Sequence, residues 1–142
     1  MAHEPRYANG ARRRALRQRL KAEGRPCWIC VVMGRSANAA RIRYDLPARH
    51  PYSFEVDELV PVSKYWLGGY TSAQAAALDY DNLAATHRCC NQWRSNKTVE
   101  EVMQIAKDTK RGKKPKGRPA PRVIGEHHTS RDWRHFRPKN KR

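Results

Sequence analysis

The chain has 142 residues, of which 30 are lysine or arginine and 13 are aspartate or glutamate, giving a formal net charge of +17. No apolar stretch approaches membrane-spanning length, and no hydrophobic run near the N-terminus resembles a signal peptide, so we expect a cytoplasmic protein. The length predicts one domain, although hydrophobic residues make up only 39% of the chain, which argues against a core that includes every segment.

The positive charge is concentrated at the two ends of the sequence. Residues 1–26 contain eight Lys and Arg against two acids, and residues 107–142 contain fourteen against three. Residues 27–106 contain eight of each and are therefore neutral. We predict a globular domain over 27–106, a basic N-terminal helix or arm over 1–26, and a basic, mostly disordered tail over 107–142.

Two basic arms beside a neutral domain favour a polyanionic partner, because each Lys or Arg that contacts a phosphate releases counterions. An acidic membrane surface is the rival partner, but the arms lack a large aliphatic face that could enter a bilayer. The arms could also serve only to keep the protein soluble. We expect nucleic acid as the partner, contacted by Arg12, Arg13 and Arg14 in the N-terminal arm.

The first predicted element is a helix over residues 9–22, a segment rich in good helix formers. Leu16 and Leu20 lie four residues apart and would share one buried face, while arginines cover the rest. Gly24 and Pro26 are expected to end this helix.

The middle of the chain predicts two short strands separated by a long loop. Residues 53–60 alternate as a strand with Phe54, Val56 and Glu58 on one face. The loop carries a helical turn over 73–78, and residues 83–86 form the second extended piece.

Two helices are predicted after the second strand. The composition of residues 88–97 suits a helix, and Thr98 with Glu101 resembles a capping box for another helix over 99–107. The order of elements predicts a small α+β fold, with a flanking N-terminal helix and a disordered basic C-terminal tail.

Four residues form two pairs with the spacing of zinc ligands, Cys27 with Cys30 and His87 with Cys90. Two intervening residues let both side chains of a tight turn reach one tetrahedral ion. Buried thiols or two disulfides are the alternatives, and a reducing cytosol favours metal over disulfides. We predict a structural zinc that joins the two ends of the middle region, with Cys89 left as a free, partly buried thiol.

These zinc pairs, the acidic strand between them and the loop ending in Asp81-Asn82-Leu83 resemble the HNH endonuclease family over about residues 27–97. The resemblance is to the small zinc-framed proteins of this family that are often found in phage genomes. It implies a ββα-metal core that holds one catalytic divalent ion, with a separate structural zinc. It also implies a bacterial host cell as the location if the chain is phage-encoded.

The resemblance implies roles for further residues. Asp57 and Asn91 match the ligands of the catalytic ion, which would be Mg²⁺, Mn²⁺ or a similar divalent cation. Arg94 and Lys97 follow on the same helix and would meet phosphate oxygens near the bond that is cut.

The general-base position departs from the family pattern, because Glu58 stands where the family has histidine. Glutamate, with a pKa of about 4.3, is a weaker base than histidine, with a pKa of about 6.5. Burial, or the adjacent charge of Asp57, would raise the pKa of Glu58. Asn82 matches the asparagine that braces the loop and orients this base.

Three functions are compatible with these features. The first, which we expect, is a metal-dependent HNH endonuclease that hydrolyses DNA phosphodiester bonds in both strands or nicks one. The second is a zinc-stabilised nucleic-acid-binding module on the same fold, with catalysis weakened at Glu58. The third is a basic RNA-binding protein whose zinc site only resembles the family, and the trio Asp57, Asn82 and Asn91 argues against it. None of the three requires a membrane or a small-molecule cofactor.

Overall fold

The computed structural model describes residues 10–114 and 117–123, and the remaining residues lie outside this description. Within it the chain forms a small mixed α+β fold, so the predicted fold class is confirmed at this level. The elements in chain order are α1 (Gly10–Glu23), α2 (Trp28–Val32), α3 (Ala37–Ala40), β1 (Phe54–Glu58), the 3₁₀ segment η1 (Val62–Gly68), α4 (Ala73–Leu78), the 3₁₀ turn η2 (Tyr80–Asn82), β2 (Leu83–His87), α5 (Arg88–Arg94) and α6 (Val99–Lys110).

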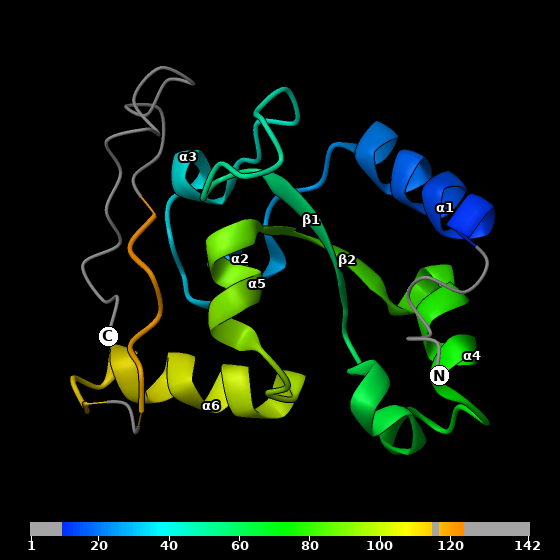
Figure 1. Ribbon diagram of the computed structural model, residues 1–142. Helices are drawn as coiled ribbons and strands as arrows, with labels where there is room; N and C mark the ends of the chain where they lie inside the picture. Colours follow the sequence, from blue (N-terminus) through cyan, green and yellow to red (C-terminus); the bar gives the residue numbers. More distant parts are fainter. Residues whose placement is uncertain (1–9, 115–116, 124–142) are drawn as a thin grey trace.

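β1 and β2 pair antiparallel and form the two-stranded sheet of the described residues. Phe54 lies opposite His87 and Glu58 lies opposite Leu83, so the acidic end of β1 is next to the start of β2. In the view of Figure 1, α1 and α4 lie to one side of this hairpin, and α2, α5 and α6 lie to the other. Because side chains alternate along a strand, Glu55 and Asp57 share the face opposite that of Glu58.

The apolar core joins the hairpin to the surrounding helices. It includes Leu20 of α1, Ile29 of α2, Leu83 of β2, Trp93 of α5 and Val102 of α6.

The N-terminal helix forms as predicted. Leu20 is fully buried and Leu16 packs against the same core while half-buried. Gly24 follows the helix with a φ of 63°, a backbone conformation that glycine adopts without steric cost, and it ends α1.

The later elements differ from expectation mainly at their ends. α5 stops at Arg94 rather than at residue 97, because Ser95 has a φ of 52° that interrupts the helix. α6 begins at the predicted cap, where the Thr98 side chain accepts a hydrogen bond from the Glu101 amide, but it continues to Lys110. The short helices α2 and α3 and the segment η1 were not predicted, since each is too brief to show a periodic pattern.

The predicted disordered tail over 107–142 begins inside α6, and residues 117–123 lie against the domain through contacts described below. Residues 124–142 lie outside the described residues, as do residues 1–9 of the predicted N-terminal arm. Within the described ranges, no helix combines the length and the apolar character that crossing a bilayer requires.

Candidate metal centre and acidic strand

The predicted zinc ligands Cys27, Cys30, His87 and Cys90 meet in one buried cluster, in which all four ligand atoms lie within 4.8 Å of one another. Cys30 Sγ lies 3.5 Å from His87 Nδ1 and 3.9 Å from Cys90 Sγ. With a Zn–S bond of about 2.3 Å, two sulfur ligands of a tetrahedral zinc stand about 3.8 Å apart, and the shorter Zn–N bond of about 2.0 Å brings a nitrogen and a sulfur to about 3.5 Å, so these spacings fit one zinc ion. All four cysteines of the chain, including the half-buried Cys89, are free thiols rather than disulfides. The cluster could therefore hold a structural zinc.

The two halves of this cluster come from two local turns. Cys27 caps the N-terminus of α2, and its amide donates to the Ala40 carbonyl at 2.8 Å. His87 is both the last residue of β2 and the N-cap of α5. Its Nε2 lies 3.1 Å from the Arg41 carbonyl oxygen, which places the proton on Nε2 and leaves the Nδ1 lone pair facing the sulfurs.

Arg35 adds a positive charge beside the thiols. Its NH1 nitrogen lies 3.2 Å from Cys30 Sγ and 3.6 Å from Cys90 Sγ. Hydrogen bonds from Cys27, then from Cys90 and Arg35, lower the pKa of Cys30 to about 3, whereas the contacts with Cys27 and Cys30 raise the pKa of Cys90. A thiolate form of Cys30 is thus favoured, and thiolate is the form that binds zinc.

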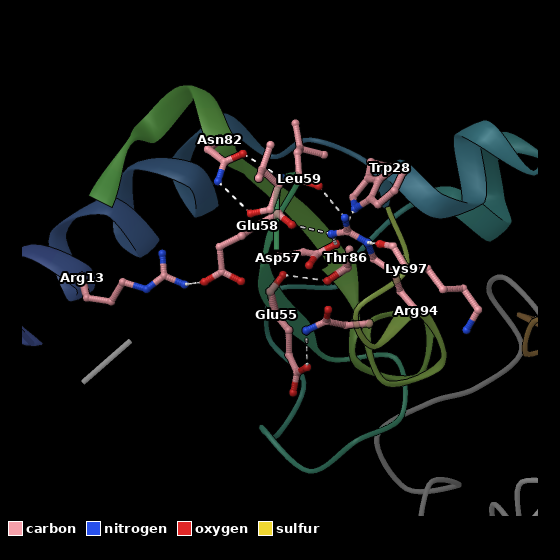
Figure 2. A network of polar contacts seen from close by, with 12 residues as sticks. Arg13, Trp28, Glu55, Asp57, Glu58, Leu59, Asn82, Thr86, Arg94 and Lys97 are labelled. Carbon is pink, nitrogen blue, oxygen red and sulfur yellow. Dashed lines mark hydrogen bonds and ion pairs between the residues drawn. The ribbon is translucent and has the colours of Figure 1, made fainter. Parts of the chain in front are cut away.

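Asp57, the predicted ligand of a catalytic ion, is buried against a tryptophan and an arginine (Figure 2). Trp28 Nε1 donates to Asp57 Oδ2 at 2.8 Å, and Arg94 NH1 donates to the same oxygen at 2.7 Å. Burial raises the pKa of Asp57 to about 6, although Arg94 and Trp28 act in the opposite direction. Trp28 lies between the first two zinc ligands, so the zinc cluster and this carboxylate are directly connected.

Arg94 is fully buried, whereas the sequence had placed it at a phosphate. Besides Asp57, its guanidinium donates to the carbonyls of Glu58, Leu59 and Lys97. These bonds hold the end of β1 to the end of α5, and in this conformation the guanidinium does not reach the surface. Lys97 is half-buried, with its Nζ 2.8 Å from the Trp93 carbonyl.

Glu58 also has an arginine partner. Its Oε1 lies 2.6 Å from Arg13 NH2, and both side chains are largely buried, at 9% and 16% exposed. Arg13 donates in addition to the Ala77 carbonyl at 2.8 Å, which connects α1 to α4. Of the three arginines expected to face phosphate, Arg13 is thus occupied by this contact, while Arg12 and Arg14 are exposed.

Asn82 lies where it can brace the turn after Glu58 (Figure 2). Its Oδ1 accepts from the Val60 amide at 2.8 Å, and its Nδ2 donates to the Val60 and Ala76 carbonyls at 3.1 Å each. The buried amide therefore connects the segment after β1 to α4.

Asn91 contacts a residue that sequence reasoning missed. Its Nδ2 donates to Glu55 Oε1 at 3.1 Å, whereas Asp57 is bound by Trp28 and Arg94. The alternation of side chains along β1 puts Glu55 on the same face as Asp57, and this pattern could have identified Glu55 from the sequence. Trp28, the hydrogen-bond donor to Asp57, was also missed, and its position between two cysteines was the only sequence signal for it.

The predicted catalytic ligands Asp57 and Asn91 thus bind protein partners and do not form a ready site for Mg²⁺ or Mn²⁺. Across residues 10–114 and 117–123, the Cys₃His cluster is the one group of three or more His, Cys, Asp or Glu side chains that could hold a metal.

Comparisons with protein-family models, with curated proteins and with solved structures found no match for this chain.

Proposed function

We propose that the chain is a divalent-metal-dependent endonuclease of the HNH type that hydrolyses DNA phosphodiester bonds. The observation that supports this best is the position of Asp57 and Glu58 at the end of a hairpin strand, with Asn82 bracing the turn behind them. The Cys₃His cluster brings the start of α2 to the junction of β2 and α5, next to the same hairpin. An acidic pair fixed in this way suits a reaction in which a water must lose a proton at a defined place.

In this proposal Glu58 accepts the proton of the attacking water. Arg13 now neutralises Glu58, and a DNA phosphate that binds Arg13 would release the carboxylate for this role. Asn82 holds the backbone next to Glu58, while Trp28 and Arg94 hold Asp57. A bound Mg²⁺ or Mn²⁺ would supply charge neutralisation at the phosphate, and its binding requires Asp57 or Asn91 to exchange its present partner.

A second candidate is a zinc-stabilised nucleic-acid-binding module without catalysis. The observation that favours it is that both carboxylates at the strand end are already neutralised by arginines. Arg94 in particular is held by three backbone carbonyls as well as by Asp57, so it is not free to leave.

Plasmid cleavage with Mn²⁺ or Mg²⁺ separates the two candidates. We expect the native chain to cleave and Glu58→Gln and Asp57→Ala to lose cleavage, while Asp45→Ala, which removes an exposed acid paired with Arg43, cleaves normally. Glu58→Gln is the cleaner variant, because its partner Arg13 is partly exposed and is not left as a fully buried charge. A native chain that binds DNA without cutting it, with cleavage appearing in Glu58→His, would favour the binding module instead.

A further inference from the structure

Residues 117–123, which we call the strap, lie against the domain after α6 (the orange segment of Figure 1). Three of its backbone carbonyls accept hydrogen bonds from side chains of the domain. Trp93 Nε1 donates to Arg118 at 2.8 Å, Arg35 NH2 to Pro121 at 2.5 Å and the Tyr52 hydroxyl to Arg122 at 3.4 Å. The strap is therefore held largely through its backbone.

Apolar packing covers only part of the strap. Ala120 and Val123 are partly buried against the core. An open cavity of about 300 Å³ lies between the strap and α6, lined by Met33, Arg35, Ile105, Thr109, Pro119 and Ala120. Because packing is incomplete here, the hydrogen bonds decide where the strap lies.

Arg35 is the residue that joins the strap to the metal centre. One nitrogen of its guanidinium contacts the sulfurs of Cys30 and Cys90, and the other contacts the Pro121 carbonyl. Three thiolates, a neutral histidine and Zn²⁺ carry a net charge of about −1, which one guanidinium cancels. A planar guanidinium held at both nitrogens is fixed in orientation, so the contact with Pro121 sets its geometry at the sulfurs.

We propose that Arg35 and the strap are part of the metal centre, Arg35 as a positioning residue for the thiolate ligands and the strap as the support of Arg35. Zinc binding and strap docking then stabilise each other, each changing the affinity of the other by the same factor. This coupling does not depend on whether the chain cleaves DNA.

The test uses four full-length proteins: the native chain, Arg35→Gln, Val123→Asp and the double variant. Val123→Asp places a charge where the strap packs on the core and should detach this end without touching a zinc ligand. Zinc affinity is measured by competition with a chromophoric chelator. Strap docking is measured in the zinc-loaded proteins from the NMR resonance of the Trp93 indole N–H. In the docked strap this N–H donates a hydrogen bond to the Arg118 carbonyl.

We expect each single variant to weaken zinc binding about tenfold, the lower end of the effect of removing an outer contact of a metal site. The double variant should be no weaker than Arg35→Gln, and the Trp93 indole resonance should shift toward that of an exposed indole in all three. Arg43→Gln, which alters an exposed ion pair, should change neither readout.

Unchanged zinc affinity in Val123→Asp would overturn the proposal. So would a double variant whose loss of zinc affinity equals the product of the two single-variant losses, because the two changes would then act independently. If Arg35→Gln does not fold, Val123→Asp still decides, because it leaves Arg35 and all four ligands in place. Arg35→Lys adds a check, since it keeps the charge but cannot contact the sulfurs and Pro121 with two separate nitrogens, and it should bind zinc with intermediate affinity.

Discussion

Asp57 shows how a single residue can be subject to opposing forces. Its carboxylate is removed from water, which favours the neutral form, while Arg94 and Trp28 both favour the charged form. Removing one member of such a buried pair costs more than the pair itself contributes, because the partner is left as an uncompensated charge. Variants at Asp57 or Arg94 will therefore change stability as well as any activity.

We expect Asp57 to titrate with a pKa of about 6, above the ordinary 3.8. The folded state then binds more protons than the unfolded state between these pH values. The contribution of Asp57 to the free energy of unfolding therefore falls as the pH rises through this window, by up to ~3 kcal/mol. Carboxyl ¹³C NMR gives the pKa, and Asp57→Asn should lack this part of the pH dependence. A midpoint near 3.8 would mean that Arg94 and Trp28 cancel the effect of burial, and a midpoint below 3.8 would mean that they outweigh it.

Trp28→Phe should lower the free energy of unfolding by about 1.5–3 kcal/mol, because a hydrogen bond to a buried charged group is removed while an aromatic ring remains. Urea unfolding of the zinc-loaded protein measures this. Trp66→Phe is the matched control, since Trp66 is 60% exposed. Equal stabilities of the two variants would show that the hydrogen bond to Asp57 contributes nothing.

At the scale of elements, the hairpin is held at its acidic end by side chains rather than by further strands. Asn82 makes two hydrogen bonds to the backbone of Val60, in the turn after β1, and a third to the Ala76 carbonyl of α4. Arg94 connects β1 to α5 with bonds to the carbonyls of Glu58 and Leu59. A two-stranded hairpin is marginal alone, so such contacts determine whether its end keeps one conformation.

Asn82→Ala should therefore destabilise the domain by about 2–4 kcal/mol, because it removes three bonds and leaves backbone groups without their partner. Thermal and urea unfolding measure the change. Asn38→Ala, at an exposed position of α3, is the control and should change stability little. A destabilisation no larger than that of the control would show that the turn holds without this amide.

At the scale of the whole molecule, the metal cluster joins segments that are far apart in sequence, α2 on one side and the β2–α5 junction on the other. Metal binding to such a site contributes directly to folding, because the unfolded chain lacks the preformed cluster.

Cys27→Ser or Cys90→Ser should release zinc and unfold the middle region, which circular dichroism and elemental analysis can follow together. Cys89→Ser keeps all four ligands and should retain the metal. A melting curve unchanged in Cys90→Ser would rule out a structural ion.

If α1 binds DNA, the dependence of binding on salt concentration provides a separate test. Arg12 and Arg14 are exposed, and removing one arginine that binds a phosphate should reduce the slope of log K against log salt by about 0.9. Replacing both, Arg12→Gln with Arg14→Gln, is thus expected to reduce the slope by about 1.8, measured on duplex DNA by fluorescence anisotropy. An unaltered slope would show that these two arginines do not bind phosphate.

The sequence alone determined the features that depend on local spacing and local chemistry. The two pairs of zinc ligands were evident because the members of each pair lie within one turn. The Thr98 cap of α6 was evident because the amide that it accepts from belongs to Glu101, only three residues away. The alternation of residues 53–60 likewise predicted a strand with Phe54, Val56 and Glu58 on one face, and β1 spans Phe54–Glu58. The α+β class followed from the order of these local patterns.

Only the tertiary structure decided which cation neutralises each acid, and whether the region after α6 contacts the domain. Glu58 pairs with Arg13 and Asp57 with Arg94, across separations of 45 and 37 residues, and no local pattern selects these arginines among the 30 basic residues. The strap has the composition of a disordered tail, yet it is bound through backbone carbonyls, which every residue carries and which composition therefore cannot reveal.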